Sequence, residues 1–122
     1  MKTILIVDDS RIMRNVIKNT LTTLGIPCQF MEAGNGAKAC EILATNKIDL
    51  VFLDWNMPEM NGMEFLAKAR AMPAYKDTPI IMVTSEAAKY NVVEALANGA
   101  TEYILKPVSE KVFLQKLALI QF

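Results

Sequence analysis

Three carboxylates, a hydroxyl group and an ammonium group follow short apolar segments of this chain, and together they could support phosphoryl chemistry. The residues are Asp8, Asp9, Asp54, Thr84 and Lys106. Carboxylate oxygens are the ligands that a hard divalent cation such as Mg²⁺ prefers. A carboxylate can also attack phosphorus and form an acyl phosphate, while a lysine ammonium group can pair with phosphoryl oxygens. These residue types therefore predict a site for a divalent metal and a phosphoryl group, if the fold brings them together.

The elements that must position these side chains are four short, wholly apolar runs. They span residues 4–7, 50–53, 80–83 and 103–105, and each ends directly before a candidate residue. Apolar runs of this length are typical of strands buried on both faces, as in a parallel sheet. Ligands of open parallel sheets bind beyond the carboxyl ends of the strands. The four strands would therefore deliver the candidate side chains to one edge of the sheet.

Apolar residues at helical spacing separate these runs, and a weaker strand is predicted over residues 27–33. The helical positions are Ile12, Met13, Val16, Ile17, Leu21 and Leu24, then Ala37, Cys40 and Ala44, then Phe65, Leu66 and Ala69, then Val92, Val93, Leu96 and Ala97, and finally Val112, Phe113, Leu117 and Ile120. Gly25 stands where a glycine would end the first helix. Five alternations of strand and helix predict one α/β domain over residues 1–122, with right-handed crossovers and helices on both faces of a parallel sheet.

Composition supports a single globular domain. The chain has 122 residues, of which 52% are hydrophobic and 21% charged, with five glycines and five prolines. Its formal net charge is zero, so nothing argues for nucleic-acid or anionic-membrane binding. The apolar start is interrupted by Asp8, and no apolar stretch approaches membrane-spanning length. We therefore expect a cytoplasmic protein in which Cys28 and Cys40 are reduced thiols.

Histidine is absent from the chain. This excludes a histidine-based catalytic triad, histidine metal ligands and an internal phosphohistidine. If the chain receives phosphate from a histidine, that histidine belongs to another protein.

Four ordered motifs resemble the receiver domain of two-component response regulators over essentially the whole chain. They are Val7-Asp8-Asp9-Ser10, the Asp54 loop with Met57-Pro58 and Gly62, Thr84-Ser85-Glu86, and Lys106-Pro107. Any one of these motifs alone would be weak evidence for the family, whereas four of them in order at matching strand ends are specific to it. The resemblance implies a doubly wound, five-stranded parallel sheet of flavodoxin-like order 2-1-3-4-5 with five helices. It also implies a cis peptide bond at Lys106-Pro107.

The same resemblance assigns roles to the candidate residues. Asp54 is expected to accept the phosphoryl group, and Mg²⁺ to bind Asp9, Asp54 and the backbone carbonyl of Asn56, with Asp8 acting through a metal-bound water. Thr84 and Lys106 are expected to contact the phosphoryl oxygens. Asn56 and Glu86 occupy positions that modulate how water reaches the acyl phosphate. This Asn/Glu pair resembles chemotaxis-type, CheY-like regulators, which lose phosphate quickly.

The resemblance also places an output surface on the fourth helix, the fifth strand and the fifth helix. Candidate residues of this surface are Glu86, Ala87, Lys89, Tyr90, Val92, Tyr103 and Val108. Tyr103 is expected to swing inward on phosphorylation while Thr84 moves toward the phosphate, as a shift between existing states. Many family members carry an aromatic residue where this chain has Val108, so the shape of its partner groove is left open.

The sequence therefore predicts a single-domain, CheY-like response regulator that is expected to be a monomer. It would take phosphate from a histidine kinase or phosphotransfer domain and act on a downstream protein, with a flagellar motor switch as one candidate. It would catalyse only its own phosphorylation and dephosphorylation.

Other interpretations remain open from the sequence. The chain could be a relay or phosphate-sink receiver, or a fragment of a longer regulator. An aspartyl-phosphate phosphatase of the haloacid-dehalogenase type is a remote alternative, because the Asp-x-Asp spacing is missing after the first strand. Asp8 and Asp9 could also merely cap the first helix, and Lys106 could be a surface lysine.

Overall fold

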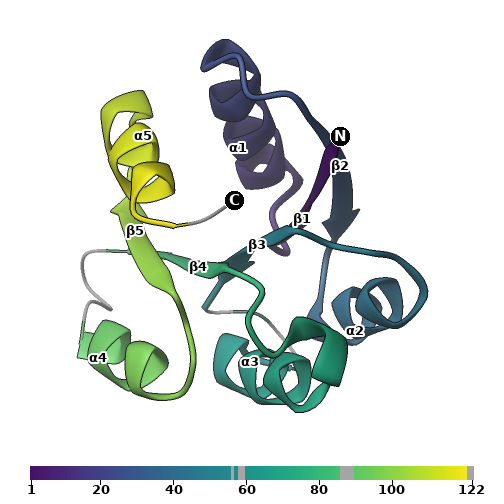
Figure 1. The fold of residues 1–122 in the computed structure, drawn as a ribbon. Helices are drawn as coiled ribbons and strands as arrows, with labels where there is room; N and C mark the ends of the chain where they lie inside the picture. Colours follow the sequence, from purple (N-terminus) through teal and green to yellow (C-terminus); the bar gives the residue numbers. More distant parts are fainter. Residues whose placement is uncertain (56, 58–59, 86–89, 121–122) are drawn as a thin grey trace.

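Strands and helices alternate along the chain in the computed structural model, which describes residues 1–55, 57, 60–85 and 90–120 (Figure 1). The strands are β1 (Lys2–Val7), β2 (Cys28–Ala33), β3 (Leu50–Asp54), β4 (Ile80–Ser85) and β5 (Glu102–Lys106). The helices are α1 (Arg11–Thr23), α2 (Gly36–Thr45), α3 (Gly62–Ala71), α4 (Tyr90–Ala97) and α5 (Glu110–Ala118), with a short 3-10 helix, η1 (Pro73–Tyr75), after α3. Within the described ranges, no helix has both the length and the apolar character needed to cross a membrane.

The five strands form one parallel sheet in the order β2-β1-β3-β4-β5. The order implied by the family resemblance is thereby confirmed. The register places Val7 beside Leu53 and Asp54 beside Val83. The residues that follow β1, end β3 and nearly end β4 therefore reach the same edge of the sheet, which we call the carboxyl edge.

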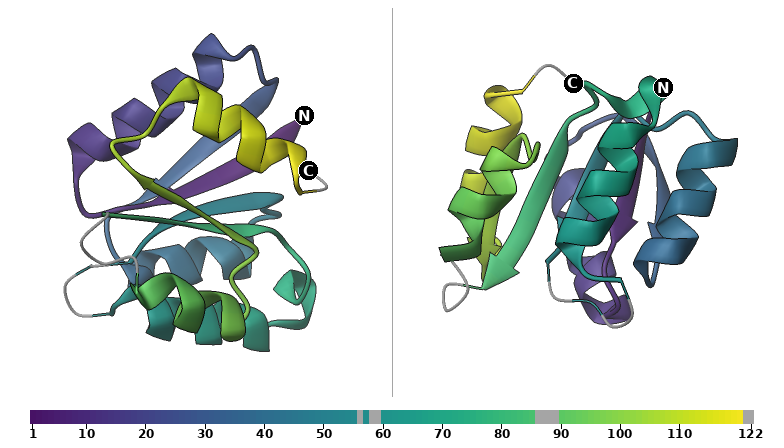
Figure 2. Two further views of the ribbon diagram at one scale, coloured as in Figure 1. Left: turned by 90° about the vertical axis from the view of Figure 1, so that its left-hand side faces the viewer. Right: turned by 90° about the horizontal axis from the view of Figure 1, so that it is seen from below.

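Each strand sends alternate side chains to the two faces of the sheet, as the two-residue period of a strand requires. On one face, Leu5 and Leu53 belong to a core beneath α2, α3 and α4; on the other, Ile4 and Phe52 belong to a core beneath α1 and α5. Figures 1 and 2 show these two helical layers on either side of the sheet. The α5 side chain Phe113 packs against Phe52 with the ring centroids 5.2 Å apart.

Side-chain caps define where several helices begin. Ser10, Asn35 and Ser109 each accept a hydrogen bond from the backbone N–H three residues later, which satisfies an otherwise unpaired helical donor. Asn61 and Glu64 form a reciprocal capping box at the start of α3. Gly25, with φ 73°, follows the end of α1 as the sequence predicts.

The structure corrects the apolar faces predicted for three helices. In α1, Ile17 and Leu21 are buried, whereas Ile12 is 78% exposed. In α4, Val92 is buried but Val93 is 75% exposed. In α2, the predicted Cys40 packs against the core, but the predicted Ala37 and Ala44 are exposed. The buried residues of this helix include Ala39, Ile42 and Leu43. These helices contain more apolar positions than one side of a helix can bury, so spacing alone does not select the buried ones.

Candidate functional site

The predicted carboxylates converge at the carboxyl edge of the sheet. Asp8 follows β1 and Asp54 ends β3, and these strands are neighbours. One carboxylate oxygen from each of Asp8, Asp9 and Asp54 lies within 4.8 Å of the others. Asp8 and Asp54 are buried, while Asp9 is exposed. Three clustered carboxylates provide the oxygen-rich donor set of a hard divalent cation.

Lys106 joins this cluster from the other half of the sheet, and Thr84 lies in β4 directly after Val83, the residue paired with Asp54. The Nζ atom of Lys106, at the end of β5, lies 3.5 Å from Asp54 Oδ1 and 3.7 Å from Asp8 Oδ2. Thr84 in β4 is 1% exposed. Within the described part of the chain, its Oγ1 atom and Asp8 Oδ2 have no hydrogen-bond partner. Buried polar atoms are rarely left unpaired without a functional reason, so these atoms are suited to bind a metal or an incoming group.

Burial is the main influence on the Asp8 carboxyl. It raises the pKa of Asp8 above its ordinary value, because the charged form loses its hydration. The Ser10 backbone N–H, which donates to Asp8 Oδ1 at 2.8 Å, and the Lys106 ammonium group act in the opposite direction. Asp9 adds like-charge repulsion that raises the pKa further. A divalent cation among these carboxylates would relieve that repulsion.

Ser10, rather than either aspartate, caps α1. Its Oγ atom accepts a hydrogen bond from the Met13 backbone N–H at 3.2 Å. Asp8 instead accepts from the Ser10 N–H, and its Oδ2 atom faces Lys106. Helix capping therefore does not account for the two adjacent aspartates, and the sequence contains its own capping residue directly after them.

A basic residue that the sequence analysis did not single out supports the Asp8 backbone. Arg14 donates from Nη1 to the Asp8 carbonyl at 2.6 Å and from Nε to Glu32 Oε1 at 3.0 Å. Lys18 donates to Glu32 Oε2 at 3.0 Å. The four-residue spacing of Arg14 and Lys18 places both on one side of α1, but no sequence signal links them to Glu32 in β2. This network fastens α1 to the strand end that presents Asp8.

The segment after Asp54 depends on a close contact between Trp55 and Gly62. Gly62 begins α3, and its N–H donates to the Trp55 carbonyl at 3.0 Å. A Cβ atom on Gly62 would lie 2.9 Å from Trp55 Cα and 2.5 Å from an atom of its ring. Glycine is therefore required at position 62 because a side chain there would collide with Trp55, and not because the backbone has a positive φ. Trp55 is 7% exposed and belongs to the core beneath α3.

Several predicted residues lie outside the described part of the chain. They are Asn56, Glu86, Ala87 and Lys89, and only the backbone of Tyr90 is described. Val92, Val93, Tyr103 and Leu105 line a shallow cavity of about 240 Å³ between α4 and β5. Val108 packs instead against the core beneath α1 and α5. The Lys106-Pro107 peptide bond is cis, as the resemblance implies.

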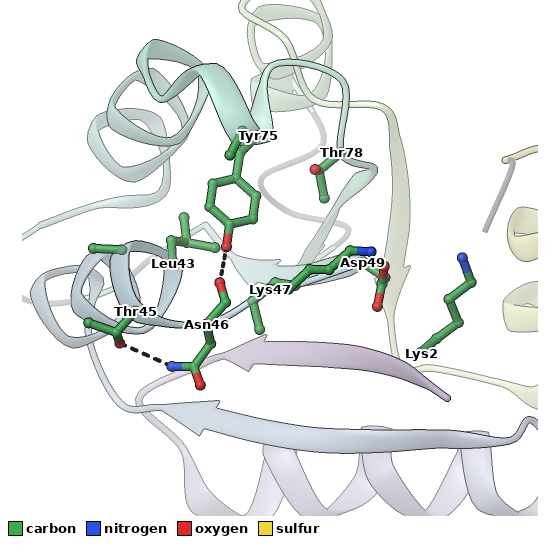
Figure 3. A pocket seen from close by; sticks show the side chains of 11 residues that line it. Lys2, Leu43, Thr45, Asn46, Lys47, Asp49, Tyr75 and Thr78 are labelled. Atoms are coloured by element: carbon green, nitrogen blue, oxygen red, sulfur yellow. Dashed lines mark hydrogen bonds between the residues drawn. The ribbon is translucent and has the colours of Figure 1, made fainter.

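A larger cavity, of about 670 Å³, lies at the opposite edge of the sheet (Figure 3). Its lining includes Lys2, Lys47, Asp49 and Thr78, which lie where β1, β3 and β4 begin. The Tyr75 hydroxyl of η1 also faces it and donates a hydrogen bond to a loop carbonyl. None of the residues predicted to act on phosphate lines this cavity, so size alone does not identify the functional site.

Comparison with known proteins agrees with this geometry. Residues 4–118 match the family model of the response regulator receiver domain. A chemotaxis protein CheY homolog from Campylobacter jejuni is 48% identical over 115 residues, which cover 93% of this chain and 88% of that protein. The structure of the chemotaxis protein CheY4 from Vibrio cholerae has 33% identity and a TM-score of 0.88, with 99% of each chain covered.

A solved structure of lower sequence identity supports the fold of this chain and nothing about its function. It is the receiver domain of the sensor histidine kinase PA1611 from Pseudomonas aeruginosa, described with a magnesium ion coordinated in its active site cleft. It is 24% identical, with a TM-score of 0.83 and coverage of 95% of this chain and 93% of that one. The profile match and the CheY relatives together are decisive for the family. The chain belongs to the response regulator receiver domains and is closely related to the CheY regulators of chemotaxis.

Proposed function

We propose that this chain takes a phosphoryl group on Asp54 from a histidine of another protein, with Mg²⁺ bound beside it. The observation that carries the proposal is the arrangement around Asp54: two further carboxylates within 4.8 Å and the Lys106 ammonium group at 3.5 Å. Nearby, the buried Thr84 hydroxyl has no hydrogen-bond partner among the described residues. Metal, nucleophile and phosphoryl-binding groups would thus lie at one edge of the sheet.

In the reaction, a carboxylate oxygen of Asp54 attacks phosphorus and forms the new P–O bond of an acyl phosphate. The P–N bond to the donor histidine breaks, and the bond's electron pair stays on the imidazole nitrogen, which then takes up a proton. Lys106 pairs with the phosphoryl oxygens, and the Thr84 hydroxyl donates a hydrogen bond to one of them. Hydrolysis of the acyl phosphate returns the carboxylate and releases inorganic phosphate.

The donor set fits Mg²⁺ because it consists of carboxylate oxygens, and because Asp8 Oδ2 is buried without a hydrogen-bond partner in the described chain. Asp9, Asp54 and the Asn56 carbonyl would bind the ion directly, with Asp8 acting through a bound water. The ion would neutralise charge that otherwise repels an anionic donor.

The output step of the proposal involves the face of α4, β5 and α5, to which α4 contributes Val92 and β5 contributes Tyr103. The family resemblance assigns Glu86, Lys89 and Val108 to the same output surface. Phosphorylation would shift this face between existing states and change its binding of a target protein. Residues 1–122 would act as one monomeric receiver domain in the cytoplasm, in chemotaxis signalling. The donor would be a sensor histidine kinase or a phosphotransfer domain, and a flagellar motor switch is one candidate target.

The experiment that tests the proposal is phosphorylation by a small phosphoramidate donor, followed by intact mass spectrometry. In Mg²⁺, the wild type should gain one phosphoryl group, and chelation of the metal should suppress the gain. Asp54→Asn should gain none. Asp77→Asn, which changes an exposed aspartate just before β4 at the opposite edge of the sheet, is the matched control and should behave as the wild type. Equal labelling of Asp54→Asn and the wild type would refute the assignment.

A further inference from the structure

We propose that Lys116, held in place by Glu102, restrains the ring of Tyr103 and so sets how readily the output face responds to phosphorylation. The inference rests on the proposed function and adds two positioning residues to it. Neither residue belongs to the phosphoryl site; Glu102 lies in β5 and Lys116 in α5, two elements of the output face.

The ammonium group of Lys116 lies over the aromatic face of Tyr103. The distance from Nζ to the ring centroid is 3.9 Å, well within the range of a cation–π interaction. The same Nζ atom lies 2.9 Å from Glu102 Oε1. The Lys116 and Glu102 side chains are only 18% and 20% exposed. Partial removal from water strengthens both contacts relative to those of exposed side chains.

Glu102 is itself fixed by the strand that carries the tyrosine. Its Oε1 atom also accepts a hydrogen bond from the Tyr103 backbone N–H at 3.1 Å. Neighbouring residues of a strand point to opposite faces, and Tyr103 packs against the core beneath α4 while Lys116 extends from α5. Because β5 is an edge strand, Lys116 can reach around that edge to the ring. The contact therefore joins α5 to a side chain of the opposite layer.

On its other side, the Tyr103 ring borders free space. The cavity of about 240 Å³ between α4 and β5 is lined by Val92, Val93 and Leu105 as well as by Tyr103. The half-buried ring is thus not enclosed by close packing on every side. Where packing leaves room for movement, a specific contact such as the one with Lys116 can determine which position is populated.

The direction of the effect follows from population shift. If phosphorylation displaces the Tyr103 ring, the displaced state must give up the contact with Lys116. Removing that contact raises the population of the displaced state, and therefore strengthens the binding of any group at Asp54 that favours it. The Glu102–Lys116 pair thus sets how much stabilisation a group at Asp54 must supply to shift the protein to the displaced state.

The test uses beryllofluoride as the phosphoryl mimic, in Mg²⁺, with two measurements. The signals of the Tyr103 ring are followed by NMR on ¹³C-tyrosine protein and assigned with Tyr103→Phe, because the chain has three tyrosines. The midpoint of the beryllofluoride titration is followed through the fluorescence of Trp55, the single tryptophan. In Lys116→Met without beryllofluoride, the Tyr103 signals should shift toward their beryllofluoride-bound wild-type positions. The titration midpoint should fall by about two- to tenfold.

Further variants separate the restraint from general damage to the fold. Glu102→Gln keeps an acceptor for the Tyr103 N–H but loses the charge that holds Lys116, so it should shift both measurements in the same direction by less. Lys116→Arg retains a cation that can stack on the ring and should remain close to the wild type. Lys111→Met, which changes an exposed lysine of the same helix, is the matched control and should have no effect.

Unchanged Tyr103 signals and an unchanged midpoint in Lys116→Met would overturn the inference while leaving the proposed function intact. The same conclusion would follow if Lys111→Met produced an equal effect. If the wild type itself failed to bind beryllofluoride, or bound it without any response of Tyr103, the proposed switching mechanism would fail and the inference with it. The wild-type titration therefore distinguishes the two failures.

Discussion

Asp8 is a residue of the site whose burial lowers the free energy of unfolding of the protein at neutral pH. Its carboxyl is 1% exposed, and burial raises its pKa above the ordinary value of 3.8. Between the ordinary and the raised pKa, the folded protein binds more protons than the unfolded chain does. The free energy of unfolding therefore decreases as the pH rises through this interval, and the loss is complete above the raised pKa.

We predict that Asp8→Asn increases the free energy of unfolding at neutral pH by on the order of 1 kcal/mol when no divalent metal is present. The amide has no charge to desolvate, and its oxygen can still accept the Ser10 N–H. Urea unfolding between pH 4 and pH 7, with a chelator, measures the effect. The wild type should lose stability across this range by more than the variant does. A less stable Asp8→Asn at pH 7 would contradict the prediction, and Asp77→Asn, which changes an exposed aspartate, should show no gain in stability.

Gly62 offers a second prediction at the scale of one residue, and Gly36 provides its control. Both glycines begin a helix, and a Cβ atom would crowd a neighbour at either position. At Gly62 the neighbours include the backbone of Trp55, whereas at Gly36 they are side-chain atoms of Met60, which can move. Gly62→Ala should therefore lower the free energy of unfolding by about 1–3 kcal/mol and alter Trp55 fluorescence.

Gly36→Ala should lower the free energy of unfolding by much less, because alanine favours the helical state and Met60 can adopt another rotamer. Chemical denaturation of the two variants, followed by circular dichroism, gives the comparison. Equal losses in both variants would show that the Trp55 backbone is not the rigid neighbour that the structure indicates.

At the scale of elements, the sequence predicted the strands better than the faces of the helices. The runs that became β1, β3 and β4 are buried on both faces, so almost every residue carries the apolar signal. The faces of α1 and α4 were less predictable, because exposed apolar residues such as Ile12 and Val93 continue the helical spacing. An exposed apolar residue costs the fold little, so the sequence does not have to exclude it.

Arg70 joins three elements that the sequence could not have linked. From α3, its Nη1 atom donates to the carbonyls of Tyr75 and Thr78, at 2.8 and 2.6 Å, on the path from η1 to β4. Its Nε and Nη2 atoms donate to the Gly99 carbonyl at 2.9 and 2.7 Å, and Nη2 also reaches Thr101. The guanidinium group thereby satisfies backbone carbonyls on both sides of β4.

We predict that Arg70→Ala lowers the free energy of unfolding by about 2–4 kcal/mol, because it leaves several partly buried carbonyls without a donor. Arg70→Lys should restore only part of this loss, since an ammonium group does not reproduce the planar fork. Lys68→Ala, in an exposed position of the same helix, should change stability by less than about 0.5 kcal/mol. Guanidinium denaturation measures all three variants, and an unchanged midpoint for Arg70→Ala would refute the role.

At the scale of the whole molecule, the part of the site made by strand ends was predictable and the part made by long side chains was not. Asp8, Asp54, Thr84 and Lys106 meet because parallel strands end at one edge, whatever the details of packing. Contacts such as those of Arg14, Arg70 and Lys116 depend on which of several partners comes within reach once the tertiary structure is formed. No local pattern encodes that choice.

The order in which the chain is synthesised affects the sheet, because different helices cover its two faces. By residue 54, all the residues of β2, β1 and β3 have been synthesised, and these three strands are neighbours in the sheet. The partner that covers Phe52, however, is Phe113 of α5, which is synthesised long after β3. A nascent chain can thus form the first half of the sheet while one apolar face still lacks half of its helical cover. During translation this face would be the natural surface for a chaperone to shield, and a chain terminated before Glu110 would remain prone to aggregation.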